Sequence, residues 1–593
     1  MPSSGGQLHL LGERRFGPFF LTQFFGAFND NVFKNALIIL IAFQSSYSGS
    51  SYSNYIINLA ALLFILPFFL FSATAGQIAD SFAKADLIRK IKLGEIAIML
   101  FAAVGFYLNS IPLLLVALFF MGTQSSFFGP IKYSIIPEHL AQKELIGGNA
   151  LVESGTFMAI LLGTMLGGIL VSITSDSRTL VSYTVITLAG LGYLSALRIP
   201  STPPVAPLLK IRWNPVVETY RNLSALRKHG AVFFAILGIS WFWFLGATYI
   251  TQLPNFTRLA LGANAQVVTF FLALLCVGIG VGSLLCERLS RRSIELGLVP
   301  IGSIGLTLFG TDIFFATAMH AADELIGLRE FLNIRSNWRL SADIFLTGLF
   351  GGIYIVPLYA MVQARTRPER RARVIAGNNI LNAIAMMGTS IYAIVLLGAG
   401  LTIPQLFLSV ALLNVVVALS IYAVVPEFLI RFIVWTLTSV VYRVMRLNLE
   451  NVPVQGPAII IFEHTSLVNT LIMRSHFHRD ARFMTYSEHS GSAIQNAFLK
   501  AAEISPAVPD QQGTMVRDMH QQLVSDLQHG NAIGIFLEVD SSLKDPSGIF
   551  WQEISQILDQ VSATAVPVSL ERRWPILEIV AGKPIRPGSG NTE

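Results

Sequence analysis

Residues 147–172 read GGNALVESGTFMAILLGTMLGGILVS, a pattern typical of a membrane-spanning helix. The stretch runs for 26 residues with Glu153 as its single charge, and about 20 apolar residues suffice to cross a bilayer as a helix. Similar stretches recur up to residue 425, whereas the sequence after residue 450 alternates between strand and helix patterns. The sequence therefore predicts a mostly α-helical membrane protein with an appended α/β domain.

The overall composition agrees with a membrane protein. Hydrophobic residues make up 53% of the 593 residues and charged residues 13%, against about 25% charged residues in soluble domains. The two cysteines, Cys276 and Cys286, lie in one apolar stretch and are interpreted as packing residues. We expect no disulfide framework, no metal site and no bound cofactor.

Twelve membrane helices are predicted, as six, a polar linker and six more. The linker, residues 198–230, contains several prolines and an amphipathic piece at 215–227. It separates two halves, 15–200 and 230–425. The predicted spans are 16–43, 54–75, 93–108, 112–133, 147–172, 180–197, 231–249, 266–285, 296–319, 342–359, 372–397 and 404–424.

An internal repeat supports the division into halves. IGGNAL at 146–151 matches IAGNNI at 375–380, and each opens the fifth helix of its half. Parallel halves related by an axis along the membrane normal are a plan that transporters use. Two further pairs occur in the same order, FGPI at 128–131 with FGGI at 350–353 and GQIAD at 76–80 with GSLLC at 282–286.

Lys and Arg gather in the loops on one side of the twelve-helix arrangement. The positive-inside rule makes that side cytoplasmic and places both termini and the C-terminal domain there. Loop charges of this kind set orientation, so the formal charge of +6 does not indicate a nucleic-acid partner. The basic residues are Lys84, Arg89, Lys90, Lys92, Lys132, Lys143, Lys210, Arg212, Arg221, Arg227, Lys228, Arg288, Arg291, Arg292, Arg365, Arg367, Arg370, Arg371 and Arg373.

The loop after the second span contains a candidate gating motif. Gly76 allows close approach of helices, and Asp80 can hold basic side chains or a helix N-terminus and so latch one conformation. Lys84 and Arg89 follow as its basic residues. An ordinary solvated loop is the alternative.

Ionisable and amide side chains inside the predicted spans form a candidate transport site, because such groups are costly in a membrane unless they face a cavity or each other. Asp30 and Lys34 are one helical turn apart and can pair, either to neutralise each other or to bind a zwitterionic head group. Glu153 is a further candidate, or a gating ion pair with Lys132. The candidate residues are Asn29, Asp30, Asn31, Lys34, Gln124, Lys132, Asn149 and Glu153.

These motifs resemble known transporter families. The loop from Gly76 to Lys90 resembles the signature loop of the major facilitator superfamily. QFFGAFNDNVFKNAL at 23–37, GTQSSFFGPIKYSIIPEHL at 122–140 and ELIGGNALVESGTF at 144–157 resemble the bacterial lysophospholipid transporter family, over roughly residues 15–425. The resemblance implies a twelve-helix major facilitator bundle. It also implies flipping of lysophospholipids, notably lysophosphatidylethanolamine, to the cytoplasmic leaflet of a bacterial inner membrane.

The remaining sequence divides into two segments. Residues 426–449 hold an uncharged run of only eleven residues, too short to span, and are predicted to form an amphipathic helix on the inner leaflet. A thirteenth span is the alternative. Residues 450–593 are predicted as the α/β domain, with strands at 458–462, 532–536, 564–568 and 576–580.

The α/β domain resembles the glycerolipid acyltransferase family, because NVPVQGPAIIIFEHTS at 451–466 is similar to the approach to that family's His-x4-Asp motif. There the His acts as general base and the Asp stabilises the imidazolium. Here His464 is present but Asn469, which is uncharged, stands at the acid position. Glu538 is kept in the second motif, while Val539 and Ser541 replace the family's Gly and Arg.

The resemblance therefore implies an acyltransferase-like domain that is inactive or severely weakened. One alternative is a bifunctional transporter and lysophospholipid O-acyltransferase, with acyl carrier protein or acyl-CoA as co-substrate. Another is a module that binds product or recruits a separate acyltransferase. Related fusion proteins add an acyl-carrier-protein ligase, but no adenylate-binding motif occurs here, so that activity is not expected.

Overall fold

The structure is a computed structural model with two compact units, residues 1–421 and 422–593, which are described separately. Up to residue 425 the structure describes residues 6–43, 51–173, 177–227, 230–290, 294–317 and 325–425. Beyond these it describes residues 428–429, 431–433, 436, 443–448, 451–453, 456–462, 469, 472–473, 481–486, 504–507, 517–528, 530–537, 546–573 and 576–585.

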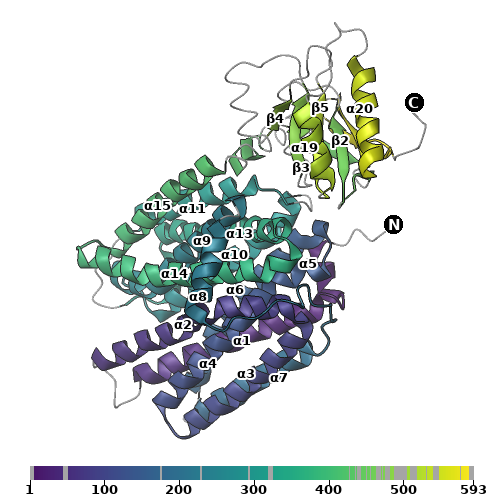
Figure 1. Ribbon diagram of the computed structural model, residues 1–593. Coiled ribbons are helices and arrows are strands. Elements are labelled where there is room, and N and C mark those ends of the chain that lie inside the picture. The colour runs from purple at the N-terminus through teal and green to yellow at the C-terminus, as the bar shows by residue number, and fades with distance from the viewer. Residues whose placement is uncertain are drawn as a thin grey trace. The chain divides into compact units, whose positions relative to one another are not determined.

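Twelve long helices build the described part of the first unit, so the predicted fold class is confirmed (Figure 1). Each predicted span overlaps one of them. The N-terminal half contains α1 (Gly17–Phe43), α2 (Ser51–Ser81), α3 (Lys84–Tyr107), α4 (Ile111–Ser134), α6 (Leu145–Ile173) and α7 (Ser177–Ala196). The C-terminal half contains α9 (Gly230–Asn255), α10 (Ala265–Leu289), α11 (Leu298–Ala316), α13 (Arg335–Arg365), α14 (Arg371–Gly398) and α15 (Ile403–Val424).

Short helices connect the long ones. The linker contains α8 (Pro215–Leu226), whose first turn is capped by the side chain of Asn214 accepting from the Val217 N–H at 3.2 Å. The other short elements are η1 (Gln7–Gly12), α5 (Ile136–His139), η2 (Gln142–Glu144), the π-helical η4 (Phe256–Ala260), α12 (Leu328–Asn333) and η5 (Pro368–Arg370).

Helix α3 shows the largest difference at a single boundary, because it begins at Lys84 instead of residue 93. Eleven of the described helices are long and apolar enough to cross a membrane by composition, and α3 is not among them. Its first half is rich in charge. Lys92, predicted as a loop residue, lies inside the helix with only 1% of its surface exposed. Its partners, described below, explain how an apolar bundle tolerates it.

The two halves repeat one packing pattern. In the N-terminal half α4 packs against α2 and α3, and α1 packs against α6. In the C-terminal half α13 packs against α10 and α11, and α9 packs against α14. The halves meet where α2 packs against α14 and α6 against α10, so each half supplies its second and fifth long helix to the shared interface.

Glycines allow close packing between α10 and α13. A Cβ atom on Gly282 would lie 1.8 Å from the carbonyl oxygen of Leu349, and one on Gly352 would lie 2.3 Å from that of Ile279. Two glycines four residues apart on each helix, at 278 and 282 and at 348 and 352, place backbone against backbone. This pair is therefore a rigid element of the C-terminal half.

The second unit contains a seven-stranded sheet of order β1-β7-β6-β2-β5-β3-β4. Neighbouring strands run parallel except β6 and β7, which are antiparallel. The strands are β1 (Arg443–Leu447), β2 (Ala458–Phe462), β3 (Ala481–Tyr486), β4 (Ile504–Ala507), β5 (Ala532–Leu537), β6 (Thr564–Arg573) and β7 (Ile576–Ala581). The helices are α19 (Arg517–Gln528) and α20 (Pro546–Val561).

Alternating side chains bury both faces of this sheet. Ile459 and Ile461 of β2 pack with α19 and α20, whereas Ile460 and Phe462 point to the opposite face. All four predicted strands are present. The predicted interfacial helix at 426–449 is corrected at its end, because residues 443–447 pair with β7 as strand β1. Residues 428–429, 431–433 and 436 within it are helical.

Candidate functional site

A buried ion pair lies between α1, α3 and α4. The Nζ of Lys92 donates to Oε2 of Glu95 at 2.6 Å, and each side chain is 1% exposed. Asn29 donates to Oε1 of the same carboxylate at 3.0 Å, and Gln124 donates to Oε2 at 3.1 Å. Two predicted site residues therefore complete the shell of a carboxylate that was not predicted.

Gly26 of α1 makes room for the lysine. A Cβ atom at this position would lie 2.3 Å from the Nζ of Lys92. The same Nζ lies 5.1 Å from the ring centre of Phe128, a cation–π distance. The carboxylate of Glu95 and the ring of Phe128 thus hold the lysine, and the lack of a side chain at Gly26 leaves space for it.

Asp30 and Lys34 lie beside this network but do not pair with each other. Asp30 Oδ2 accepts a hydrogen bond from Ser125 at 2.8 Å, and its buried Oδ1 has no hydrogen-bond partner. The Nζ of Lys34 lies 5.5 Å from the ring centre of Phe64 on α2. Within the described residues no ion pair joins the two, although helical spacing allows one, because each is drawn toward a different neighbouring helix.

A second cluster surrounds Glu153 on α6. Oε1 of Glu153 accepts from the hydroxyl of Tyr133 at 2.6 Å, while its buried Oε2 has no hydrogen-bond partner. The ring of Tyr133 stacks on Tyr359 of α13, with centroids 4.2 Å apart and planes 4° apart. This carboxylate therefore sits where the two halves touch.

Lys132 does not form the ion pair with Glu153 that the sequence offered as an alternative. Its Nζ donates to the hydroxyl of Thr156 at 2.7 Å, and that hydroxyl is 3.1 Å from Oε1 of Gln23. Lys132 thus links α4 to α6.

Asn31, another predicted site residue, is 8% exposed and donates to the carbonyl of Ala27 one turn earlier at 2.7 Å. Its amide therefore bonds within its own helix.

Asn149 joins the two halves directly. Its Nδ2 donates to Oε1 of Gln363 at 2.7 Å, and the amide of Gln363 donates back to its Oδ1 at 2.9 Å. Asn149 is fully buried. The structure thus places this predicted site residue in the closure between α6 and α13.

The predicted gating motif lies at the contact between α2 and α14. Asp80, fully buried, accepts from the backbone N–H of Ala372 at 3.1 Å and from Nε of Arg373 at 2.9 Å. Ala372 is the second residue of α14, so the carboxylate meets the positive end of that helix. A Cβ atom on Gly76 would lie 2.7 Å from that of Ala376, so glycine permits the approach.

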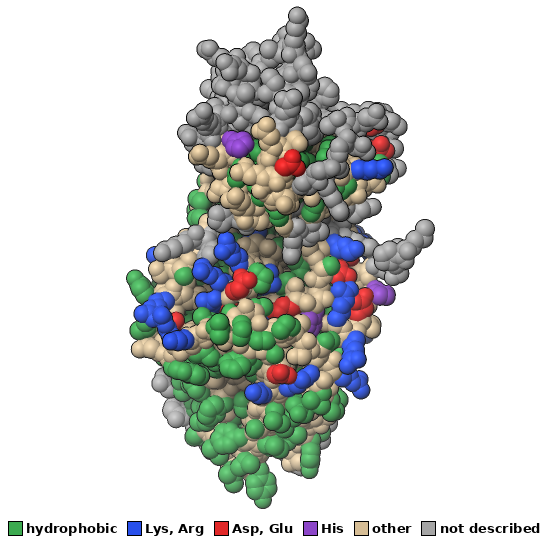
Figure 2. Space-filling view, turned by 45° about the vertical axis from the view of Figure 1, so that its right-hand side comes forward, with side chains coloured by type: hydrophobic (Ala, Val, Ile, Leu, Met, Phe, Trp, Pro, Cys, Tyr) green, Lys and Arg blue, Asp and Glu red, His purple; other side chains and the backbone are tan. Residues whose placement is uncertain are grey.

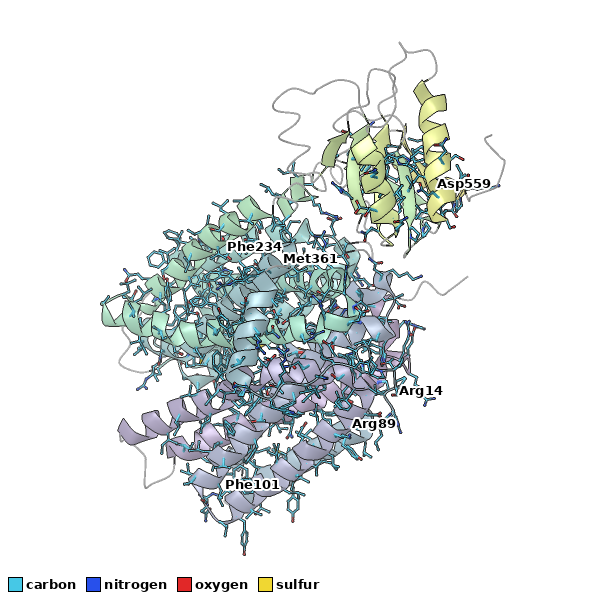
Figure 3. The ribbon with its side chains drawn as sticks, in the orientation of Figure 1. Arg14, Arg89, Phe101, Phe234, Met361 and Asp559 are labelled. Carbon is cyan, nitrogen blue, oxygen red and sulfur yellow. The ribbon has the colours of Figure 1, made fainter. Side chains whose placement is uncertain are left out.

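Lys84 and Arg89 hold the linker against the N-terminal half. Lys84 donates to Oε1 of Glu138 at 2.5 Å, and the other oxygen of Glu138 accepts from Thr202 at 2.6 Å. Arg89 donates to the carbonyl of Ile199 at 2.9 Å. In Figure 3, Arg89 and Phe101 show the direction in which α3 runs away from this end of the bundle.

The contacts that join the two halves, at Asp80, Asn149 and Tyr133, lie at the end of the bundle that carries the basic loops. Gln7 adds another, because its backbone N–H donates to Glu287 at 2.9 Å. Nearby, outside the spans, Arg15 donates to Glu13 and holds the pKa of that carboxyl below its ordinary value. Figure 2 shows Lys and Arg side chains gathered in a band next to an apolar surface of this unit. Because the two halves touch through these contacts, the structure is closed at its basic end.

In the second unit the predicted catalytic residues follow strands β2 and β5 in the sequence. β2 and β5 are adjacent and parallel, with Phe462 opposite Phe536, so the segments that follow them leave the same edge. His464 and Glu538 belong to those segments and lie outside the described residues. Asn469 is described as helical and half-buried.

Sequence reasoning missed Glu95, and it placed Lys92 in a loop. The available signal was the spacing of Lys92 and Glu95, which are three residues apart at the start of the predicted span and would share one face of a helix. Within the part of the chain that the structure describes, no cluster of three or more His, Cys, Asp or Glu could hold a metal.

Known transporters are similar to the membrane unit of this chain. The curated "Lysophospholipid transporter LplT" of Enterobacter sp. (strain 638) is 28% identical over 379 residues, which cover 63% of this chain and 85% of that protein. Its counterpart in Escherichia coli O7:K1 is 28% identical over 383 residues, covering 64% and 86%. FucP, a major facilitator transporter solved in the outward conformation, has a TM-score of 0.52 at 14% identity, covering 70% of this chain and 99% of that one.

Family models match two regions. The Acyltransferase model matches residues 443–571, which begin with strand β1 and contain the sheet up to β6. The Major Facilitator Superfamily model matches residues 19–327, more than half of the chain. The protein therefore belongs to the major facilitator superfamily and carries a C-terminal domain of the acyltransferase type.

Proposed function

We propose that the membrane unit transports lysophospholipids, such as lysophosphatidylethanolamine, to the cytoplasmic leaflet of a bacterial inner membrane. Relatives that carry the name lysophospholipid transporter align over 85% of their own length, which supports this substrate class. In this proposal the basic end of the bundle, both termini and the acyltransferase-type domain face the cytoplasm.

One observation carries the proposal: Asp30 and Lys34 lie one helical turn apart without an ion pair between them. Asp30 has one buried oxygen without a hydrogen-bond partner, and no ion pair joins it to Lys34 among the described residues. Phosphoethanolamine offers an ammonium group to the carboxylate and a phosphate to the lysine. A zwitterionic head group would thus satisfy two charges that the apolar surroundings make costly.

Transport then requires that the site open to alternate sides. The contacts at Asp80, Asn149 and Tyr133 close the basic end in the structure. We propose that a lysolipid enters laterally from the outer leaflet, and that rocking of the halves breaks these contacts and releases the head group on the cytoplasmic side.

Flipping of labelled lysophosphatidylethanolamine into proteoliposomes tests the site. Asp30→Asn removes the charge that would meet the ammonium group, and a hydrogen bond to a charged group contributes about 1.5–3 kcal/mol. We expect flipping at limiting substrate to fall roughly 10- to 150-fold. Asp86→Asn is the matched control, because Asp86 is more than half exposed and pairs only with Arg89 among the described contacts. Equal flipping by Asp30→Asn and wild type would remove Asp30 from the mechanism.

A second candidate function is reacylation of the transported lysolipid. The match to the acyltransferase family, and a sheet that brings the ends of β2 and β5 together, favour it. We propose that Asn469 leaves the domain inactive or weak, because an amide cannot stabilise a protonated His464 as a carboxylate does. The domain would then bind acyl carrier protein or recruit a separate acyltransferase.

An acyl-transfer assay with the full chain separates these alternatives. We expect little transfer from acyl-CoA or acyl carrier protein to lysolipid in the wild type, and a gain in the Asn469→Asp variant. Robust transfer by the wild type that collapses in His464→Ala would show an active enzyme. Binding of acyl carrier protein without turnover would favour the recruitment role.

A further inference from the structure

A cavity of about 210 Å³ lies at the basic end of the membrane unit, apart from the candidate transport site. Its walls come from the end of α2, the linker with α8, and the start of α14. The cavity is therefore shared between the two halves, because α2 belongs to one half and α14 to the other.

Arginines dominate the polar lining of this cavity. Arg212, Arg221, Arg370 and Arg373 line it, and Glu218 is its single acid among the described lining residues. Glu218 accepts from Arg221 at 2.9 Å and from Gln77 at 3.3 Å, and lies 3.9 Å from Arg212. Asp80, buried behind this lining, accepts from Arg373, so four positive charges against the two negative charges of Glu218 and Asp80 leave a net charge of +2, which a phosphate group would offset.

The linker beside this cavity carries large exposed side chains. Trp213, Val216 and Tyr220 are 71%, 67% and 75% exposed on the linker beside it. Exposed tryptophan and tyrosine with an apolar neighbour are typical of a helix that lies in the membrane interface. Arg221 of this helix lines the cavity, so a helix lying in the interface would bring the cavity to the phosphate layer of the leaflet.

We propose that this cavity binds the phosphate of an anionic phospholipid head group, and that the bound phosphate holds the basic end closed. The phosphate would contact Arg221 from the linker and Arg370 or Arg373 from the C-terminal half. A ligand that bridges parts which separate on opening binds the closed state better, so it shifts the population toward that state. The proposal does not depend on which substrate the transporter carries.

The test uses the full chain in lipid nanodiscs. Spin labels at Lys143→Cys and Arg367→Cys, both exposed and on opposite halves, report the separation at the basic end; Cys276 and Cys286, both buried, are replaced by Ala. Phosphatidylglycerol is titrated into phosphatidylcholine. We expect it to raise the population of the short distance in the wild type.

The double variant Arg212→Gln/Arg221→Gln should lower the apparent affinity for phosphatidylglycerol roughly 30-fold. Each arginine near an anionic lipid surface strengthens binding roughly fivefold, and the variant removes two. Both arginines are more than half exposed, so the variant should fold, which its melting temperature in phosphatidylcholine verifies. Arg288→Gln, at an exposed arginine outside the cavity, is the control and should respond like the wild type.

Inorganic phosphate, compared with chloride at equal ionic strength in nanodiscs without phosphatidylglycerol, distinguishes the source of the anion. No response to phosphate supports a lipid head group. A response to phosphate that reproduces the lipid effect would overturn the lipid assignment in favour of a soluble anion. If the double variant and the wild type respond equally to phosphatidylglycerol, the cavity is not the binding site.

Discussion

Replacing Asp80 by Asn should weaken the closure of the basic end. The carboxylate is fully buried and joins α2 to α14 through the Ala372 N–H and the guanidinium of Arg373. Asparagine fills nearly the same volume but carries no charge. The variant therefore isolates the electrostatic part of the latch, while the close packing at Gly76 is retained.

The size of the effect follows from the two contacts. Hydrogen bonds to charged groups contribute about 1.5–3 kcal/mol each. Arg373 is 29% exposed, and the amide oxygen of Asn can still accept one bond, so the loss corresponds to about one of the two contacts. A loss of about 2–3 kcal/mol shifts the ratio of open to closed molecules roughly 30- to 150-fold.

Spin labels at Lys143→Cys and Arg367→Cys measure that ratio as a distance distribution. We expect the long-distance population to grow in Asp80→Asn, and Arg373→Gln to produce a similar change because it removes the other partner. Asp86→Asn should leave the distribution unchanged. A distribution in Asp80→Asn that matches the wild type, in folded protein, would refute the latch.

Three further predictions concern the buried contacts. Lys92→Met and Glu95→Gln should each destabilise the fold by about 3–5 kcal/mol, because one buried charge loses its partner; the double variant should lose less than the sum in a denaturation cycle. Gly282→Ala should lower the melting temperature markedly, since its methyl group would meet a backbone carbonyl of α13, whereas Gly190→Ala, in open space within α7, should be neutral or stabilising. Tyr133→Phe, which removes the hydroxyl bonded to the buried carboxylate of α6, should slow lysolipid flipping without unfolding the protein, as fluorescence melting would show.

The membrane fold followed from local properties of the sequence. The length of an apolar stretch and the positions of basic loops each concern neighbouring residues, so twelve helices and their division into halves could be read directly. Strand β2, with five buried residues in succession, was equally clear. Strands β1 (RVMRL), β3 (ARFMTY) and β4 (ISPA) were missed because polar residues or proline interrupt their apolar runs.

The composition of the site depended on partners far apart in the chain. Asn29 bonds to Glu95, 66 residues later, and Asn149 bonds to Gln363, 214 residues later. Helical spacing suggested that Asp30 would pair with Lys34, but Ser125 on another helix supplies the hydrogen bond instead. Spacing along one helix shows which of its side chains can pair, but it does not show which side chains of neighbouring helices compete for the same hydrogen bond.

Hydropathy and motifs along the chain predicted twelve long helices in two repeated halves and the type of the C-terminal domain. Which buried charges are paired, and at which end the halves close, became visible only from the packing of the helices. The physical reason is that hydropathy and periodicity are sums over adjacent residues, whereas a buried ion pair or an interhelical latch exists only when packing brings distant side chains within hydrogen-bonding distance.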